Sequence, residues 1–342
     1  MSTQTRMYAE VQEIPTAIER LISQAKSAIS DTAADLRQSG ANQVMTVARG
    51  SSDHAATYLK YACELVLGLP VASVGPSIAS VYNASLGNDN AVCIGISQSG
   101  QSPDIVKMVQ RATEKGATSV AITNNIESPL AHTSRHVIPL IAGPELSVAA
   151  TKTFVSSLVA GLMLVAHWKQ EHALIKAIDS LPDQLDQALK IDWSKQLASW
   201  SYSNGMYVVG RGLSFAMANE AALKFKETCQ VHAEAFSSAE VLHGPVSLID
   251  EAFPVLALIS QDASEDGIAD VCDQLSEHGA HVFATSSAVQ QARRLECVRT
   301  GHPLTDPIPL IVSFYVFVEK LARVRGGNPD QPRHLNKVTK TV

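Results

Sequence analysis

Charge is scarce in this sequence, and the little that is present carries no basic excess. Only 18% of the 342 residues are charged, whereas 46% are hydrophobic, a balance that is too apolar for a disordered chain. The net charge of −6 offers no basic surface for nucleic acid and makes bulk binding to anionic membranes unfavourable. The length suffices for two domains of about 150 residues, each with its own core.

Cysteine pairs and long apolar runs are also missing. The five cysteines include no Cys-x-x-Cys pair, so we expect a reduced intracellular protein without disulfides or a zinc knuckle. Residues 1–6 are polar and predict no signal peptide. The longest apolar stretch, 154–168, is shorter than the roughly 20 residues of a membrane span, and we expect a buried helix there. The sequence therefore predicts a cytoplasmic protein.

One pattern occurs twice along the chain. Residues 44–52 form a short apolar run that ends in a Gly/Ser turn before a helical stretch, and residues 206–214 repeat this arrangement. A second apolar run, 91–98, has a counterpart at 254–261. The matching positions lie 162 or 163 residues apart, so we infer a duplicated domain.

Each copy alternates short apolar runs with helical patterns. Continuous apolar runs such as 91–96 suit parallel strands in a sheet that is covered on both faces, and βαβ units with right-handed crossovers build a doubly wound α/β sheet. In such sheets, ligands bind beyond the carboxyl ends of the strands. The Gly/Ser turns lie at those ends, which makes them the first candidates for a site.

We predict five segments along the chain. They are an N-terminal helical arm (1–34), a first α/β domain with the phosphate-binding loop (35–175), a helical linker (176–195), a second α/β domain with the acid/base residues (196–327) and a C-terminal tail (328–342).

Residues 97–102 read Ser-Gln-Ser-Gly-Gln-Ser and lie between an expected strand and a helix that Pro103 opens. The N-terminus of a helix offers N–H donors with partial positive charge, and the hydroxyls add more donors, so the loop is typical of a phosphate site. Ser51 and Ser52, in the turn after the neighbouring strand, could add their hydroxyls. The alternative is an ordinary serine-rich turn that caps a helix.

The second copy has a different loop. Asp262 takes the place of Ser99, and Glu265 takes the place of Ser102. Because two carboxylates would repel a phosphate dianion, the sequence predicts one phosphate per chain.

The second copy carries candidates for proton transfer instead. Glu220, Lys224 and Glu227 have the spacing i, i+4 and i+7 and share one face of an expected helix. The alternative is an exposed salt-bridge ladder. Small or apolar neighbours favour a partly buried site, where burial and Lys224 could tune a glutamate for proton transfer. His243 precedes a Gly-Pro turn, which favours a presented imidazole, whereas His232 lacks such a turn and is expected to be structural or merely exposed.

These ordered motifs resemble the sugar isomerase (SIS) domain family, and the chain is similar nearly end to end to the isomerase half of glucosamine-fructose-6-phosphate aminotransferase. The resemblance implies an α/β fold of two tandem SIS domains, each a doubly wound, mostly parallel five-stranded sheet flanked by helices. The motifs that carry it are 7–15, 49–52, 97–102, 148–152, 220–227, 232–235, 240–245 and 328–337.

The resemblance implies a role for each matching residue. The residues expected to bind the phosphate and the sugar are Ser51, Ser52, Ser97, Gln98, Ser99, Ser102, Val148 through its backbone, and Glu220. The residues expected to act in catalysis are Glu227, which moves a proton between C1 and C2, Lys224 beside it, His243, which opens the sugar ring from the neighbouring subunit, and Lys337, which forms a Schiff base with a ketose.

Departures from the family's pattern indicate the reaction. We expect no glutaminase half and no N-terminal nucleophilic cysteine, and the family's usual Gly-Thr-Ser turn is Gly50-Ser51-Ser52. These variants resemble stand-alone members that remove the amine from an amino sugar phosphate. The resemblance therefore implies glucosamine-6-phosphate deaminase activity, in which aldose–ketose isomerisation is coupled to loss of ammonia and yields fructose 6-phosphate.

Alternatives stay open. The same scaffold could serve a fructosamine-6-phosphate deglycase or a galactosamine-6-phosphate deaminase/isomerase. A non-catalytic sugar-phosphate sensor would need only the serine loop, so the joint presence of the four catalytic candidates argues against it. In the deaminating direction the Schiff base is optional, and Lys337 could simply hold the sugar hydroxyls.

The expected partners are an amino sugar phosphate and a second copy of the chain, in a homodimer with a shared active site. We expect no nucleic acid, membrane, metal ion or cofactor to take part, because this proton chemistry needs none.

Overall fold

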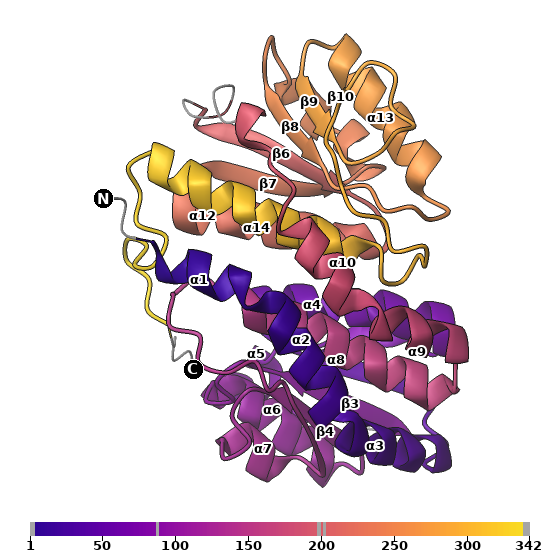
Figure 1. The fold of residues 1–342 in the computed structure, drawn as a ribbon. Helices are drawn as coiled ribbons and strands as arrows, with labels where there is room; N and C mark the ends of the chain where they lie inside the picture. Colours follow the sequence, from indigo (N-terminus) through magenta and orange to yellow (C-terminus); the bar gives the residue numbers. More distant parts are fainter. Residues whose placement is uncertain (1–3, 87–88, 197–199, 201–202, 338–342) are drawn as a thin grey trace. The chain divides into compact units, whose positions relative to one another are not determined.

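The computed structural model describes residues 4–86, 89–196, 200 and 203–337. The chain divides into two compact units, which we call the first and second lobes (Figure 1). The first lobe comprises Ile14–Glu145, Lys152–Asp179 and Asn336–Val342. The second lobe comprises Met1–Glu13, Leu146–Thr151 and Ser180–Leu335.

The first lobe contains a five-stranded parallel sheet with the strand order β2-β1-β3-β4-β5. β1 and β3 pair from Gln43 opposite Ala91 to Val47 opposite Gly95. The two strands therefore end at the same edge, and the turns that follow them emerge at that edge. The strands are β1 (Gln43–Val47), β2 (Val71–Ser73), β3 (Ala91–Ile96), β4 (Thr118–Thr123) and β5 (His136–Pro139).

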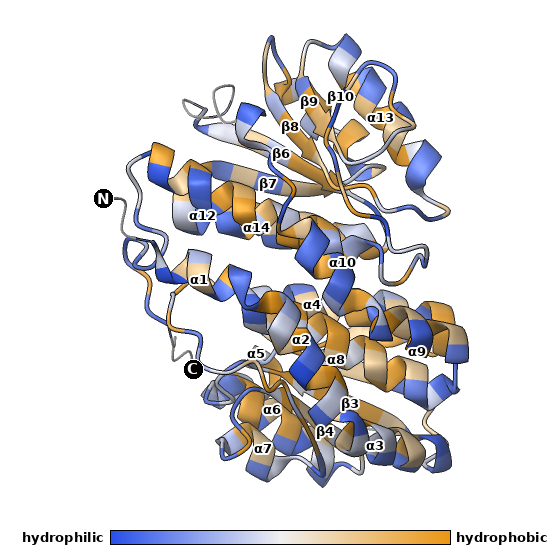
Figure 2. Cartoon of the chain, in the orientation of Figure 1, coloured by the Kyte–Doolittle hydropathy of each residue, from blue (hydrophilic) through white to orange (hydrophobic). Residues whose placement is uncertain are grey.

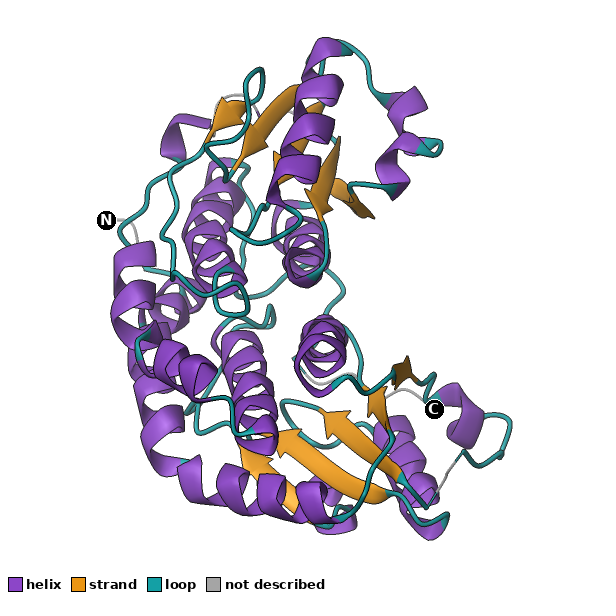
Figure 3. Ribbon diagram, turned by 90° about the vertical axis from the view of Figure 1, so that its right-hand side faces the viewer, coloured by secondary structure: helices purple, strands orange, loops and turns teal. Residues whose placement is uncertain are grey.

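Helices lie on both faces of this sheet (Figure 3). Within the lobe, α8 packs against α2, α3 and α4 and is buried along nearly its whole length, which confirms the predicted buried helix. The helices are α2 (Ile14–Gln24), α3 (Lys26–Gln38), α4 (Ser51–Ala62) with a following π-helical turn (Cys63–Leu67), α5 (Ser77–Ser80), α6 (Pro103–Glu114), α7 (Pro129–Thr133), α8 (Lys152–Lys169) and α9 (His172–Asp179).

The second lobe repeats the architecture. Its five parallel strands have the order β10-β9-β8-β6-β7, which is the order of the first sheet when the strands are matched in sequence. The strands are β6 (Gly205–Gly210), β7 (His232–Ser237), β8 (Pro254–Ala257), β9 (His281–Ala284) and β10 (Arg293–Arg294). The helices are α1 (Arg6–Gln12), α10 (Leu181–Ala188), α12 (Leu213–Cys229), α13 (Glu265–Glu277) and α14 (Pro307–Val324), with short 3-10 turns at Ser194–Gln196, Glu240–Leu242 and Pro245–Leu248.

The two sheets confirm the predicted α/β fold with two five-stranded sheets, and every pairing among the described strands is parallel. The predicted segment boundaries remain a prediction. The structure groups α1 with the second lobe and α2 and α3 with the first.

Aromatic packing fixes α12 against α14 in the second lobe. The ring of Phe225 on α12 lies 5.1 Å from Phe314 on α14, in an edge-to-face arrangement. Trp200 packs edge-on against both Phe225 and Phe317. Such aromatic pairs add about 0.5–1.5 kcal/mol beyond the burial of their area. This contact fixes the rotation of α12 and therefore the direction in which its polar face points.

Hydrophobic residues extend along much of α8 and α14 (Figure 2), and both helices are buried in their own lobes. Within the described part of the chain, no helix has the combination of length and apolarity needed to cross a lipid bilayer.

Candidate functional site

The serine loop, residues 97–102, connects β3 to α6 in the first lobe. Two of its hydroxyls hold the loop in shape. The buried Ser97 accepts a hydrogen bond at Oγ from the N–H of Gly100 (3.1 Å), and Ser99 accepts one from the N–H of Gln101 (3.3 Å). The loop is thus an ordered turn whose hydroxyls already act as acceptors.

The two helices that begin beside this turn have no side-chain caps. Ser102 precedes α6 and Gly50 precedes α4, and neither residue supplies a capping hydrogen bond from its side chain. Ser51 and Ser52 are the first residues of α4, and both are half-buried. The helix that follows the serine loop therefore has no side-chain cap from Ser102, although Ser97 and Ser99 do bind amides within the turn. The phosphate role itself remains a prediction.

Gly100 is required by the fold of the loop. Its φ of +62° lies in the left-handed region that favours glycine, and a Cβ atom there would lie 2.0 Å from Oγ of Ser128. Ser128 fills the space beside this glycine, so the glycine allows the loop to pack against the turn after β4.

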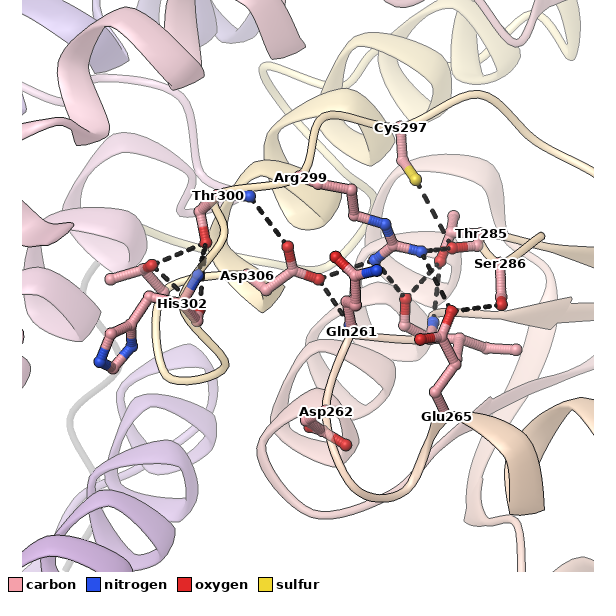
Figure 4. Close-up of polar contacts among 12 residues, drawn as sticks. Gln261, Asp262, Glu265, Thr285, Ser286, Cys297, Arg299, Thr300, His302 and Asp306 are labelled. Carbon is pink, nitrogen blue, oxygen red and sulfur yellow. Dashed lines mark hydrogen bonds and ion pairs between the residues drawn. The ribbon is translucent and has the colours of Figure 1, made fainter. Parts of the chain in front are cut away.

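The corresponding turn of the second lobe carries its own anion. The N–H of Gln261, the counterpart of Gln98, donates to Oδ2 of Asp306 at 2.7 Å (Figure 4). Asp306 is almost fully buried. Its carboxylate also accepts from the N–H of Thr300 at 3.0 Å and from Nη1 of Arg299 at 2.7 Å. A carboxylate of the chain thus takes the position in which a bound anion would meet this amide.

The two acidic residues of that turn are held in place as well. Asp262 accepts from both the N–H and the hydroxyl of Ser264 at 2.7 and 2.6 Å. Glu265 accepts from the hydroxyl of Ser286 at 2.6 Å and lies 3.8 Å from Arg299 (Figure 4). Three carboxylates around one turn support the prediction that the second copy binds no phosphate.

The acid/base candidates form a buried triad on α12. Nζ of Lys224 lies 3.3 Å from Oε1 of Glu220 and 2.5 Å from Oε2 of Glu227. The side chains of Lys224 and Glu220 are completely buried, and that of Glu227 is 19% exposed. The alternative of an exposed salt-bridge ladder is therefore wrong, because the aromatic packing between α12 and α14 turns this face inward. Glu227 is the member of the triad that can reach a ligand.

A fourth residue belongs to this cluster and was not predicted. The hydroxyl of Tyr315, on α14, donates to Oε1 of Glu220 at 3.0 Å in a fully buried setting. In the sequence, Tyr315 stands in the apolar run of α14 and looks like a core residue. A tyrosine within such a run is a weak signal, since a buried hydroxyl needs a polar partner.

The two carboxylates control the charge of Lys224. Burial alone would lower the pKa of this amine, but Glu220 and Glu227 outweigh that effect and raise the pKa above its ordinary value of 10.5. Lys224 is therefore an ammonium at neutral pH. It can hold Glu227 in one orientation and supply positive charge beside it.

His243 is exposed and ends the short 3-10 turn Glu240–Leu242. Its N–H donates to the carbonyl of Glu240 at 2.9 Å, and the next residue, Gly244, has a φ of +142°. The turn thus presents the imidazole on the surface of the second lobe, as the Gly-Pro sequence suggests. His232 is also exposed, at the start of β7.

The backbone around Val148 is held by both ends of the chain. The buried carboxylate of Glu10, on α1, accepts from the N–H groups of Leu146 and Ser147 and from the Ser147 hydroxyl. The N–H of Val148 donates to the carbonyl of Asp330 at 3.3 Å. Since its amide is used in this way, the half-buried Val148 can offer a ligand its carbonyl oxygen.

Lys337 is paired within the first lobe. Its Nζ lies 2.8 Å from Oε2 of Glu145, which is completely buried. The same carboxylate accepts from the N–H and the hydroxyl of Thr153 at 3.0 and 2.7 Å. Burial acts to raise the pKa of Glu145, but Lys337 and Thr153 outweigh it and hold the pKa below the ordinary 4.5. Glu145 was not among the predicted site residues.

Comparisons with known proteins agree with these observations. The model of the SIS domain family matches residues 38–167 and 201–294. The isomerizing glutamine–fructose-6-phosphate aminotransferase of Sulfolobus acidocaldarius is 31% identical over 344 residues, which cover 97% of this chain and 56% of that protein. The chain thus spans about half the length of the curated relatives that it matches, and that part is their C-terminal isomerase half.

Solved structures share the whole fold. A proposed phosphosugar isomerase from Silicibacter pomeroyi is 55% identical, with a TM-score of 0.93 over 95% of this chain and 100% of that chain. The C-terminal domain of glucosamine-fructose-6-phosphate aminotransferase from Francisella tularensis is 25% identical, with a TM-score of 0.89 over 97% and 99% of the two chains. A glucosamine-6-phosphate deaminase from Thermotoga maritima is 18% identical, with a TM-score of 0.75 over 98% and 100%, and shares the fold alone.

Proposed function

Because the chain belongs to the SIS domain family, we propose that it is a sugar phosphate isomerase whose reaction ends in loss of ammonia. The proposed substrate is glucosamine 6-phosphate and the proposed products are fructose 6-phosphate and ammonia. The resemblance of the chain to the isomerase half of an enzyme of amino sugar metabolism supports this choice of substrate class.

One observation carries the proposal. Glu227 is a carboxylate with limited exposure, and the buried ammonium of Lys224 holds it on one side. A base of this kind can take a proton from carbon and return it to the neighbouring carbon. Burying a triad of charges costs free energy of desolvation. Binding of a sugar phosphate alone does not require such a triad, which therefore favours an enzyme over a sensor.

The proposed steps use the chain's own groups. The serine loop binds the 6-phosphate through amides and hydroxyls. His243 moves the proton that opens the pyranose ring. Glu227 then takes the proton from C2 and delivers it to C1, while a proton passes from the amine nitrogen to O1, so that the carbon bearing the amine becomes an imine. Water adds to this imine, and ammonia leaves as the C2 carbonyl forms. Lys337 donates hydrogen bonds to the sugar or serves as the amine of a Schiff base.

The test separates isomerisation from deamination. The protein is incubated in D2O with glucosamine 6-phosphate, galactosamine 6-phosphate, a fructosamine 6-phosphate or fructose 6-phosphate. Ammonia release and deuterium incorporation at C1 and C2 are then followed by NMR. We expect ammonia and fructose 6-phosphate from glucosamine 6-phosphate at the highest kcat/KM of the panel. Deuterium exchange without ammonia release would show that the protein is an isomerase and not a deaminase. Binding without either signal would favour the non-catalytic sugar-phosphate sensor.

We also propose that the chain acts as a homodimer in which His243 completes the site of the partner. The exposed position of this imidazole supports the idea, and the resemblance implies it. The test mixes two inactive variants, His243→Ala and Glu227→Gln, allows their subunits to exchange and then measures activity. Recovery of up to about a quarter of the wild-type activity is expected, since half of the dimers are then hybrids, each with one intact site out of two. No recovery in a demonstrated mixed dimer would contradict the shared site.

A further inference from the structure

An ion pair joins the two turns that lie at the ends of β1 and β3. Arg49, in the turn after β1, donates from Nε at 3.0 Å and from Nη2 at 2.8 Å to Oδ2 of Asp104. Asp104 lies in the first turn of α6 and is completely buried, whereas half of the Arg49 side chain is exposed. The other carboxylate oxygen accepts from the N–H of Ile105 at 2.9 Å.

The position of this pair is informative. Because β1 and β3 are hydrogen-bonded neighbours that end together, the pair fastens the turn that carries Ser51 and Ser52 to the serine loop. The pair therefore lies between the two sets of predicted phosphate ligands.

The pair also sets the local charge. Asp53 and Asp104 lie in the first turns of α4 and α6, where acidic residues stabilise helices but oppose the binding of a second anion. Burial raises the pKa of Asp53, whereas the charges of His54 and Arg49 lower it. Arg49 thus acts on both carboxylates, as the ion-pair partner of Asp104 and, after His54, as a second positive charge near Asp53.

The second lobe lacks the pair. The counterpart of Arg49 is Arg211, but the counterpart of Asp104 at the same spacing is Gly267. The acidic partner is therefore present in the copy with the serine loop and absent from the copy whose turn is filled by Asp306. This difference argues against a role that the fold itself requires.

We propose that Arg49 is a positioning residue for phosphate binding, which acts through Asp104 by fixing the two turns and cancelling the carboxylate charge beside the dianion. This inference rests on the proposed phosphate role of the serine loop. It assigns Arg49 no direct contact with the ligand.

The experiment measures binding rather than turnover. Isothermal titration of inorganic phosphate and of fructose 6-phosphate is compared for wild type, Arg49→Gln, Asp104→Asn and the double variant. Arg49→Gln should weaken both ligands by about tenfold or more, because it removes the positive charge that pairs with the buried Asp104 carboxylate beside the anion. The double variant should return to within about threefold of wild type, since the charge that Arg49 balances is gone. Arg49→Lys, which keeps the charge, should also stay within about threefold.

A matched control removes an arginine elsewhere in the same lobe. Arg135 forms an exposed pair with Asp35 at 3.5 Å, and Arg135→Gln should leave phosphate binding unchanged. Circular dichroism checks that each variant is folded, and the double variant keeps the test valid if Arg49→Gln alone is unstable.

Each outcome decides. A double variant as weak as Arg49→Gln would show that the Asp104 charge is not what Arg49 offsets and would overturn the proposal, and unchanged binding by Arg49→Gln would remove its role. If wild type binds phosphate but releases no ammonia, the deaminase proposal fails and this one stands. If wild type binds neither ligand, the serine loop is no phosphate site and this inference falls with it.

Discussion

The ammonium of Lys337 lies 2.8 Å from a carboxylate of Glu145 that has no exposure to solvent. Glu145 is itself held by Thr153 in the first turn of α8, so the lysine of the tail is fixed to the helix in the core of the first lobe. This contact gives a residue near the end of the chain a defined place, which a free tail could not provide.

We expect Glu145→Gln to act through Lys337. The neutral side chain keeps its shape but releases the ammonium, and a small misplacement of a reacting group can cost up to about 10²-fold in rate. Turnover of glucosamine 6-phosphate should therefore fall by roughly tenfold to a hundredfold. The double variant with Lys337→Met should be no slower than Lys337→Met alone. Additive losses would show that Glu145 acts independently, and Glu114→Gln, at the exposed end of α6, serves as the control.

The same pair predicts a pH dependence of stability. The pKa of Glu145 lies below its ordinary value of 4.5 in the folded protein. Its stabilising effect is therefore present above about pH 4.5 and is lost as the pH falls through the lower, folded pKa. Unfolding free energies of wild type and Glu145→Gln, measured in urea between pH 7 and pH 3, should differ by a constant amount down to about pH 5. The difference should shrink as the pH falls below 4.5, and a difference that stays constant from pH 7 to pH 3 would contradict the prediction.

Glu227→Gln should separate catalysis from binding. A general acid or base contributes about 10²–10⁴-fold, so kcat should fall by about that factor. The affinity for fructose 6-phosphate, measured by titration, should change little, because the serine loop is untouched. Glu277→Gln, at the exposed C-terminal end of α13, should behave like wild type. Unchanged kcat in Glu227→Gln would exclude Glu227 as the base.

Lys224→Met tests the buried triad through stability. Removing one partner of a buried ion pair leaves its charge uncompensated and costs about 3–5 kcal/mol. Lys226 lies on the same helix but is exposed, so Lys226→Met should change the free energy of unfolding by at most about 0.5 kcal/mol. Urea denaturation of both variants measures the contrast. Equal changes in the free energy of unfolding at the two positions would show that the buried triad does not stabilise the fold more than an exposed lysine does.

Gly100→Ala should disturb the serine loop more than the backbone strain alone explains. Gly40 has nearly the same φ, +65°, but a Cβ atom there would have nothing within 4 Å. Gly40→Ala should therefore cost only the conformational strain, about 1–3 kcal/mol. Gly100→Ala adds the clash with Ser128 and should also weaken phosphate binding. Equal losses in the two variants, with phosphate binding intact, would show that the loop tolerates the side chain.

Local patterns predicted the elements that bear the site. The continuous apolar run 91–96 became β3, and the spacing of Glu220, Lys224 and Glu227 placed them on one face of α12. In both cases the signal lies within a dozen neighbouring residues. The counterpart run 254–261 contains β8 as well, although the strand itself ends at Ala257.

The contacts that support the candidate site could not be predicted from the sequence because they join distant parts of the chain. Tyr315 meets Glu220 across 95 positions, and Asp306 meets Gln261 across 45. No periodicity in the sequence reports which side chain of α14 faces α12. β10 was equally hidden, since it consists of the two exposed arginines 293 and 294, and the five-stranded sheet was expected from the family resemblance rather than from any apolar run.

The attachment of both chain termini to one stretch of backbone has a practical side. Glu10 reaches Leu146 across 136 positions of sequence, and Asp330, whose carboxylate also receives the N–H groups of Arg6 and Met7, bonds Val148 from the opposite end. A truncation that reaches Glu10 or Asp330, or a tag fused beside either residue, would alter the hydrogen bonds that hold the backbone around Val148. Deletions that remove Glu10 or Asp330 are therefore expected to disturb the backbone around Val148, near the middle of the sequence.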